Sequence, residues 1–268
     1  MKLETYSIKS LYVPALAEGE GVGTAYEYFA KRLVLARWLN RWLKKRPFPP
    51  KPRLLIAGLP EKYGSSLDFM LLGEELGAEV TVLDERPFAL EKLQQGLAAA
   101  QKEGWLTAVT PRYQSVTRLD THFPVNEQYD LVLASEVLQR LEGDEQQLYV
   151  AACSRVGTAV ALFAPNAENA AHANLSGLAT VELDRMKTLF QQTADLTLQT
   201  SGYIDMPPFP PGMMRTEDQR EQASSGTFEA VAMWGLGYYA RLEHILPTAV
   251  RRKQSHIVYG MGISTEAD

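Results

Sequence analysis

The chain has 268 residues and a formal net charge of −5, which argues against a general nucleic-acid binder, because such proteins usually carry a basic excess. Hydrophobic residues make up 46% and charged residues 22%, the balance of a globular protein with a full core. The single cysteine, Cys153, excludes an intrachain disulfide framework and a cysteine-rich metal centre, and we expect it to be buried. The N-terminus lacks the apolar core of a signal peptide, and no apolar run is long enough to span a bilayer, so a cytoplasmic protein is expected.

The first predicted element is a long helix from about Tyr26 to Lys45, closed by the Pro-rich stretch 47–52. Residues 29–46 include seven lysine or arginine residues and no acidic residue, beside an apolar stripe with two tryptophans. Such a helix can lie on an anionic membrane surface. It can equally pack its stripe onto the sheet or onto a partner subunit, so peripheral membrane contact and oligomerisation both stay open. We expect residues 1–49 to form a helical cap.

From residue 53 onward, short β-rich runs alternate with helical stretches, a pattern typical of βαβ crossovers and a parallel sheet. Runs such as "DLVLA" are apolar on both faces, as expected for strands covered by helices on both sides. A Pro-rich insertion around 205–226 is predicted to lack regular structure, and a helix over 227–246 follows it. The predicted strands are 53–58, 79–85, 129–135, 158–165, 195–205 and 255–264, and the helices between them are 65–77, 87–103, 136–153 and 180–192.

The stretch "RLLIAGLPEKYG" (53–64) indicates a ligand-binding loop at the end of the first strand. Ligands of open parallel sheets bind beyond the carboxyl ends of the strands, where glycine lets the backbone approach closely. Gly58 ends this strand, Gly64 follows six residues later, and Asp84 ends the second strand "VTVLD". A carboxylate at that place typically accepts hydrogen bonds from a ribose. Gly58 by itself could mark only a tight turn, but its combination with Asp84 favours a nucleoside-containing ligand.

The order of these elements resembles the class I S-adenosylmethionine-dependent methyltransferases over residues 50–264. "EVTVLDERPFALEKLQ" is similar to their second motif, "YDLVLASEVLQRLEGDEQQLYV" to the motif of the fourth strand, and "ALFAPNAEN" to the fifth strand and its exit. The first motif departs from the family, because Ile56 stands where an acid is usual and the turn has few glycines. The resemblance implies a Rossmann-like α/β fold, with a doubly wound seven-stranded sheet that is mostly parallel and has an antiparallel last strand. Residues 50–268 would form this domain, acting as a methyltransferase.

The resemblance implies S-adenosylmethionine as cofactor, with its ribose on Asp84 and its tail near Gly58. The loop itself argues against a dinucleotide, because Pro60 removes a backbone donor where a diphosphate needs several. Two alternatives remain: an NAD(P)-dependent oxidoreductase, which lacks its G-x-G-x-x-G turn here, and a catalytically inactive methyltransferase-like scaffold or regulatory subunit. The residues that the resemblance places at the cofactor are Gly58, Leu59, Gly64, Asp84, Glu85, Gln114, Ser115, Ser135 and Glu136, although Ser135 and Glu136 also fit a helix N-cap and first turn.

Polar residues after the fifth strand predict the acceptor side of the site. In "APNAENAAH" (164–172), His172 is the candidate general base, and Asn166 and Glu168 are candidates for orienting the acceptor. The same residues fit a capped loop before the next helix. The resemblance also suggests that the N-terminal helix roofs the site, with Tyr26 or Tyr28 near the cofactor. Prolines and methionines in 205–214 favour a small, apolar or aromatic acceptor. No metal site and no nucleic-acid partner are expected.

Overall fold

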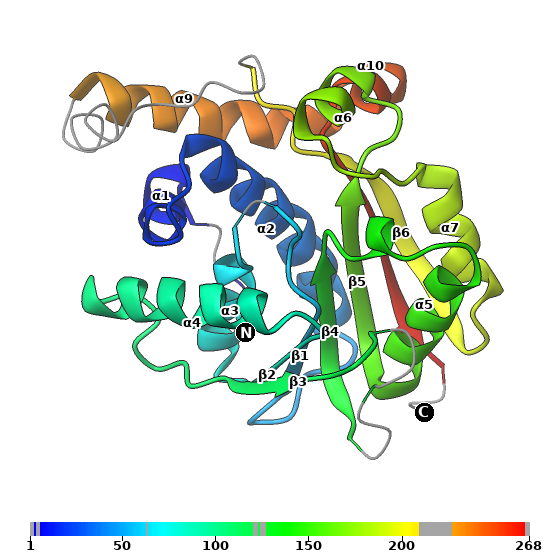
Figure 1. The fold of residues 1–268 in the computed structure, drawn as a ribbon. Helices are drawn as coiled ribbons and strands as arrows, with labels where there is room; N and C mark the ends of the chain where they lie inside the picture. Colours follow the sequence, from blue (N-terminus) through cyan, green and yellow to red (C-terminus); the bar gives the residue numbers. More distant parts are fainter. Residues whose placement is uncertain are drawn as a thin grey trace.

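The computed structural model describes residues 3, 6–62, 64–119, 123, 127–208 and 227–265, and these form a seven-stranded sheet with helices on both faces (Figure 1). The strands lie in the order β3-β2-β1-β4-β5-β7-β6. Their bounds are β1 Arg53–Ala57, β2 Glu79–Asp84, β3 Arg112–Ser115, β4 Tyr129–Ser135, β5 Gly157–Pro165, β6 Leu196–Ile204 and β7 Ile257–Ser264.

All strand pairs are parallel except the two that β7 makes, with β5 and with β6. The sheet is therefore mostly parallel with an antiparallel last strand, and the predicted fold class is confirmed. Between and around the strands lie the helices α1 Ile8–Ala17, α2 Val22–Trp42, α3 Leu67–Leu76, α4 Pro87–Lys102, α5 Asp144–Val156, α6 Ala170–Ser176, α7 Leu183–Gln192, α9 Thr227–Leu242 and α10 Thr248–Gln254, together with the 3-10 turns η1 Leu138–Arg140 and η2 Glu243–Ile245.

Alternate residues of the central strands enter two separate cores, because successive side chains of a strand point to opposite faces. Leu54 and Ile56 of β1 pack with α1–α4 and α9 on one face. Leu55 and Ala57 pack with α5 and α7 on the other. Both faces are buried, which explains the continuous apolar runs in the sequence. Cys153 lies buried in the second core, as expected.

The apolar stripe of the N-terminal helix packs on the protein itself. Phe29, Trp38 and Leu39 of α2 are buried in the first core, and Trp42 stacks on Trp38 at a centroid distance of 6.4 Å. α9 crosses above α1 and α2 (Figure 1). Across the described ranges, no helix has both the length and the apolar character needed to cross a membrane. The packing interpretation of this helix is therefore favoured.

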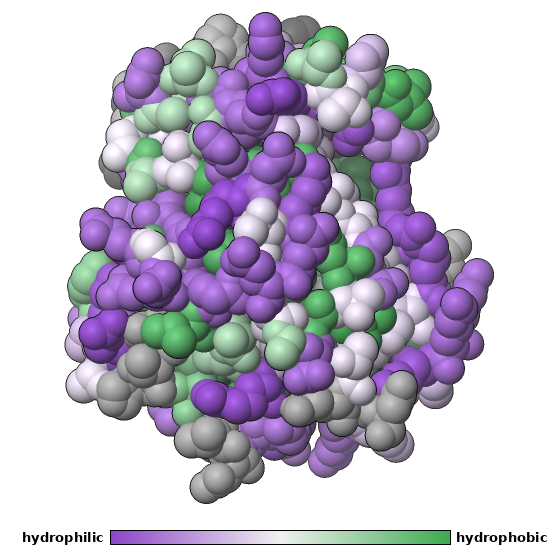
Figure 2. Space-filling view, turned by 90° about the vertical axis from the view of Figure 1, so that its right-hand side faces the viewer, coloured by the Kyte–Doolittle hydropathy of each residue, from purple (hydrophilic) through white to green (hydrophobic). Residues whose placement is uncertain are grey.

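The surface on the side of α7 and α10 is mainly hydrophilic. In the side view of Figure 2, apolar residues appear only as small patches among polar ones. Polar surface of this kind matches the ordinary charged fraction of the sequence. The Pro-rich stretch from 209 to 226 lies outside the described residues, as does Tyr63 in the loop after β1.

Candidate active site

The sheet brings most of the predicted site residues to one edge. β1, β2, β4, β5 and β6 run in the same direction, so the loops that follow them open on the same side. β7 starts at this edge because it runs the opposite way, and the His256 backbone N–H donates to the Asp205 carbonyl there at 2.7 Å. Open α/β sheets bind their ligands beyond this edge. The candidate site is therefore the region beyond this edge, which is called the crevice below because ligands of such sheets bind there.

Asp84 is fully buried at the end of β2, and protein groups engage both of its carboxylate oxygens. The Leu59 backbone N–H donates to Oδ2 at 2.7 Å, and the Arg86 N–H donates to Oδ1 at 2.8 Å. The Arg86 guanidinium folds back onto the same carboxylate, with Nε 2.9 Å from Oδ1 and Nη2 3.0 Å from Oδ2. Asp84 therefore fastens the loop after β1 to the sheet, and a ribose contact at this carboxylate requires Arg86 to turn away.

Arg140 and Glu85 extend this ion network to η1. Arg140 Nη2 lies 3.8 Å from Asp84 Oδ2, and its Nη1 lies 3.2 Å from Glu85 Oε1. Glu85 Oε2 also accepts a hydrogen bond from the Leu119 backbone N–H at 3.3 Å. Burial, and then the neighbouring Arg86, lower the pKa of Arg140. Neither arginine was predicted as a site residue, and the available signal was only that Arg86 follows the expected ribose acid by two positions.

The loop after β1 directs its backbone N–H groups at carboxylates of the same chain. Beyond Leu59, which donates to Asp84, the N–H groups of Glu61 and Lys62 donate to Glu136 Oε2 at 3.0 and 3.2 Å. A phosphate would need these same donors. The occupied donors therefore add to the sequence argument against a dinucleotide.

Two more carboxylates reach this loop from the turn between α1 and α2. Glu20 Oε1 accepts from the Gly64 N–H at 3.2 Å. Glu18 Oε1 accepts from the N–H groups of Ser65, at 2.9 Å, and Leu67, at 3.3 Å, at the start of α3. A carboxylate at a helix N-terminus satisfies free N–H groups and the helix dipole together. The α1–α2 turn is thus joined to the sheet by these contacts.

The two glycines of the loop both have positive φ, +98° at Gly58 and +66° at Gly64. A Cβ atom at Gly58 would lie 2.7 Å from Val137 Cγ2, and one at Gly64 would lie 2.4 Å from Tyr28 Oη. Both positions therefore require glycine, as predicted. The groups that approach them are side chains of this chain, and the Tyr28 hydroxyl donates to Glu18.

The expected helix over 136–153, with Ser135 as its N-cap, is wrong at its start. Glu136 has φ +55°, outside the helical region, and α5 begins only at Asp144, after Gly143 with φ +48°. The backbone turns at Glu136 because its carboxylate binds the loop after β1, and the 3-10 turn η1 fills the interval. Ser135 Oγ is consequently buried at the strand end without a hydrogen-bond partner among the described residues.

Gln114 and Ser115 lie within β3 rather than in the loop after it. Ser115 pairs with Asp84 in the parallel register, and Gln114 pairs with Leu83. Both therefore lie beside the predicted ribose acid at the same edge. Gln114 is half-buried and Ser115 is exposed, and their contact with an adenine ring stays a prediction.

Of the candidate residues after β5, Asn166 and Glu168 make contacts within the protein, whereas His172 keeps a ring nitrogen without a partner among the described residues. Asn166 is fully buried, and its amide nitrogen donates to the carbonyls of Arg252 and Ser255, both at 2.8 Å. Glu168 forms an ion pair with Arg252 and accepts from the Tyr203 hydroxyl. These contacts join the β5 exit to α10, as the capped-loop interpretation proposes.

The third candidate, His172, lies on α6. Its ring stacks on His256 at a centroid distance of 3.9 Å, and His256 Nδ1 lies 3.1 Å from Asp205 Oδ2. His172 Nδ1 is buried and has no hydrogen-bond partner within the described ranges. Burial, together with His256, lowers the pKa of His172 to about 4, so its ring is neutral at neutral pH. A neutral ring offers either a donor or an acceptor to a ligand in the crevice.

Carboxyl groups outnumber cations beneath the cap. Lys31 is fully buried, with Nζ 3.0 Å from Glu27 Oε1 and 3.1 Å from Asp68 Oδ2. The pKa of Glu27 is raised to about 8, mainly by burial, which outweighs the lowering by Lys31, with smaller contributions from Glu136 and Asp205. Burial likewise raises the pKa of two more carboxyl groups, Glu18 and Glu243, each to about 7. A cation entering this crevice would therefore be stabilised.

We expect native stability to fall as the pH rises from about 5 to 8. Glu18, Glu27 and Glu243 keep their protons up to pH 7 or 8 in the folded chain, but ionise near 4.5 when unfolded. In this interval the native state binds more protons, so each such proton removes about 1.4 kcal/mol of stability per pH unit. Urea unfolding at several pH values measures the slope. Glu27→Gln should flatten it, and a stability that rises over the same interval would contradict the assignment.

Comparison with known proteins gives likenesses in structure but none in sequence. No protein-family model matches the chain, and no curated protein matches it. Magnesium protoporphyrin IX methyltransferase from Synechocystis, solved with bound SAH, is 8% identical, with a TM-score of 0.49 over 88% of this chain and 83% of that one. A TehB-like SAM-dependent methyltransferase from Corynebacterium glutamicum is 14% identical, with a TM-score of 0.44 over 90% and 98%.

An S-adenosylmethionine-dependent methyltransferase from Clostridium acetobutylicum is 8% identical, with a TM-score of 0.47 over 89% of this chain and 92% of that one. The seven strands, their mostly parallel pairing and the antiparallel β7 are those expected from the resemblance in the sequence. The chain has a seven-stranded, mostly parallel sheet with an antiparallel last strand and helices on both faces. Identities this low concern the fold alone, so the function has to be argued from this chain's own residues. In the part of the chain that the structure describes, no group of three or more His, Cys, Asp or Glu residues could hold a metal ion.

Proposed function

We propose that the crevice at the carboxyl edge binds S-adenosylmethionine and that the chain is a methyltransferase for a small acceptor. The observation that carries this proposal is a set of carboxyl groups near this edge, the buried Glu243 and the partly exposed Glu18 and Glu27, whose pKa values are raised. S-adenosylmethionine is a sulfonium with an ammonium group, so it supplies the positive charge that these carboxyl groups lack. The loop after β1 has few N–H groups left for a phosphate, which disfavours a dinucleotide.

Unpaired polar atoms at the strand ends support a ligand in the same place. Ser135 Oγ, His172 Nδ1 and Asp205 Oδ1 are buried without hydrogen-bond partners among the described residues. Buried polar groups are normally paired, and each exception asks for an explanation such as a bound molecule. A ligand beyond β4, β5 and β6 would reach all three.

Bound there, the cofactor would supply an already activated methyl group, so the chain mainly has to align an acceptor with it. His172 is our proposed partner for the acceptor, because its neutral ring has a free nitrogen beside the strand ends. With a pKa of about 4 the ring is a weak base, so it serves best by holding a protic acceptor in line. We keep a small, apolar or aromatic molecule as the proposed acceptor class, with Glu168 and Asn166 fixing the loop that carries His172.

The second candidate function is a methyltransferase-like domain without catalysis, a scaffold or regulatory subunit. The ion network around Asp84 favours it, because Arg86 and Leu59 occupy the oxygens that a ribose would use. The two functions differ in one measurable respect. The enzyme binds the cofactor, and the silent domain does not.

Titration calorimetry with S-adenosylmethionine, S-adenosylhomocysteine and NAD tests the proposal. We expect the first two to bind, S-adenosylmethionine about tenfold more tightly because of its positive charge, and NAD to fail. Glu27→Gln should reduce the difference between the first two. Arg86→Met frees Asp84 and should tighten both, whereas Arg155→Met, an exposed change on α5, should leave them unchanged. If neither S-adenosylmethionine nor S-adenosylhomocysteine binds to wild type or to Arg86→Met, the second candidate function, a scaffold or regulatory subunit without catalysis, is supported instead.

A further inference from the structure

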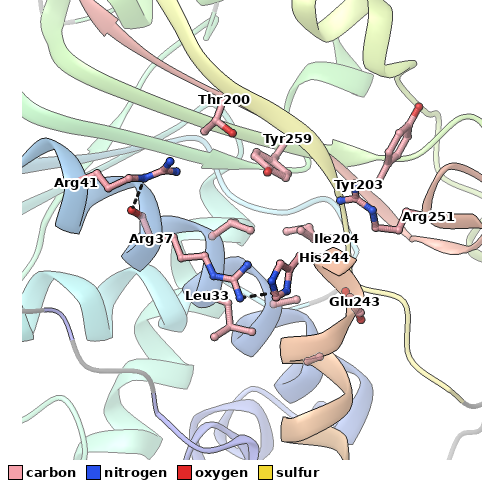
Figure 3. A pocket seen from close by; sticks show the side chains of 13 residues that line it. Leu33, Arg37, Arg41, Thr200, Tyr203, Ile204, Glu243, His244, Arg251 and Tyr259 are labelled. Atoms are coloured by element: carbon pink, nitrogen blue, oxygen red, sulfur yellow. Dashed lines mark hydrogen bonds between the residues drawn. The ribbon is translucent and has the colours of Figure 1, made fainter. Parts of the chain in front are cut away.

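A pocket of about 150 Å³ lies between α2, the edge strand β6, the end of α9 with η2, and α10 (Figure 3). Its side chains come from segments far apart in the sequence, among them Arg37 on α2, Thr200 on β6 and Arg251 on α10. A cavity of this size takes a molecule about as large as benzene. The sequence carries no local signal for this pocket, because His244 and these arginines share no motif.

The rim of the pocket is positively charged. Arg37, Arg41 and Arg251 line it together with His244, whose Nδ1 lies 3.3 Å from Arg37 Nη2 (Figure 3). Arg41 Nε donates to the Arg37 carbonyl at 3.1 Å, and Arg251 Nε donates to the Leu246 carbonyl at 3.2 Å. Within the described residues, none of the three guanidinium groups pairs with a carboxylate. Each therefore keeps N–H donors for an anion.

One acidic residue, Glu243, also lines the pocket, but its carboxyl group is engaged elsewhere. Its Oε1 accepts from the Met206 N–H at 2.9 Å and from the Tyr26 hydroxyl. It therefore faces the cap rather than the arginines. The rim keeps a clear excess of positive charge in a protein that is acidic as a whole.

The floor of the pocket is apolar. Ala30 and Leu33 of α2 form one side, and Ile204 and Tyr259 of the sheet form the other, all of them buried. An apolar floor with a few charged groups at its edge is the usual construction of a small-molecule site. The apolar floor favours a ligand with an apolar part, and the guanidinium groups at the rim favour a ligand that also carries a carboxylate.

We propose that this pocket binds a small organic carboxylate, with its apolar body against Leu33 and Ile204 and its charge between Arg37, Arg41 and Arg251. This pocket differs from the proposed methyl-donor site in its arginine lining, although Glu243 borders both. A ligand of the crevice is cationic, and a ligand of this pocket is anionic. The two can therefore be tested with different probes.

The test measures the binding of benzoate and of hexanoate to the full chain, by calorimetry and by changes in NMR chemical shifts. Benzamide and hexanamide serve as neutral matched compounds, and inorganic phosphate serves as an anion without an apolar body. We expect the two carboxylates to bind one to one and to weaken as salt is added, and the amides and phosphate to bind at least about tenfold more weakly. Amides or phosphate that bind as well as the carboxylates would overturn the proposal.

Substitutions of residues that line the pocket test whether the carboxylate binds there. Arg37→Gln and Arg251→Gln should each weaken benzoate binding about tenfold, because each removes a charge-assisted contact. Lys253→Gln, an exposed change on α10 outside the pocket, is the matched control. Thr200→Trp fills the pocket from the edge strand without altering an arginine, and should abolish binding. Unchanged binding in all three pocket variants, with circular dichroism like that of wild type, would place the carboxylate elsewhere and overturn the proposal.

Discussion

Replacing Lys31 with methionine is expected to lower the free energy of unfolding by about 3–5 kcal/mol. The ammonium group is fully buried and lies within 3.1 Å of carboxylate oxygens of both Glu27 and Asp68. It also lies 5.0 Å from the ring centroids of Tyr28 and Phe69. Methionine preserves most of the volume but leaves the two carboxyl groups without their cation. Removing one partner of a buried ion pair is strongly destabilising for this reason.

Urea denaturation measures the loss, with Lys45→Met as the control, because Lys45 is exposed. The triple variant Lys31→Met, Glu27→Gln, Asp68→Asn carries no buried charge at this place. It should recover much of the stability, since neutral replacement of a whole buried ion pair is often harmless. A loss below about 1 kcal/mol in the single variant would mean that Asp68 is protonated, as Glu27 is up to about pH 8, and that neither carboxyl group needs a cation.

The second large effect is expected at Asp84, where Asp84→Asn should lower the unfolding free energy by about 3 kcal/mol or more. The carboxylate accepts from Leu59 and Arg86 and lies 3.8 Å from Arg140. The amide would leave the partly buried Arg86 guanidinium without its described countercharge and leave Arg140 with Glu85 alone. Chemical denaturation without cofactor reveals this structural role, and Asp184→Asn, an exposed change, is the control.

The same prediction decides which variant can test the ribose contact. A change at Asp84 lowers stability whether or not a cofactor binds, so lost binding in that variant would be ambiguous. Arg86→Met leaves the acid in place and removes only the competing guanidinium. If Asp84→Asn were as stable as wild type, Arg86 would not depend on this carboxylate, and the ion network would have to be discarded.

The sequence predicted the strands well because their pattern is local. The apolar runs of β1, β4 and β5 are bounded by turn residues, and the ends of the six predicted strands were placed within about two residues. β3 was not among the predicted strands, because its four residues are mostly polar and lack a buried apolar run. Gly58 and Asp84 were predicted to lie together at one edge, and they do, since parallel strands end on the same side. The later start of α5 was missed because a tertiary contact sets it. Glu136 leaves the helical region to reach N–H groups 74 and 75 residues away in the sequence.

Long-range partners also account for the unpredicted part of the site. Glu18 and Glu20 lie in the turn after α1, 44 to 49 residues from the N–H groups they accept from. No local pattern announces such a contact. Arg140 lies in a stretch that resembles a family motif, yet its role follows from facing Asp84 across the crevice. Charge partners of this kind become visible only once the sheet order is known.

The contacts of Glu18 and Glu20 have a consequence for how a ligand enters. These side chains hold the N–H groups at the start of α3, so the α1–α2 turn cannot lift off without exposing those amides to water. Opening the crevice from this side and loosening the first turn of α3 are therefore a single cooperative event. The open state that admits a ligand is also the state in which the amides of Gly64, Ser65 and Leu67 exchange with solvent. Their exchange rates would set a lower limit on how fast this route opens.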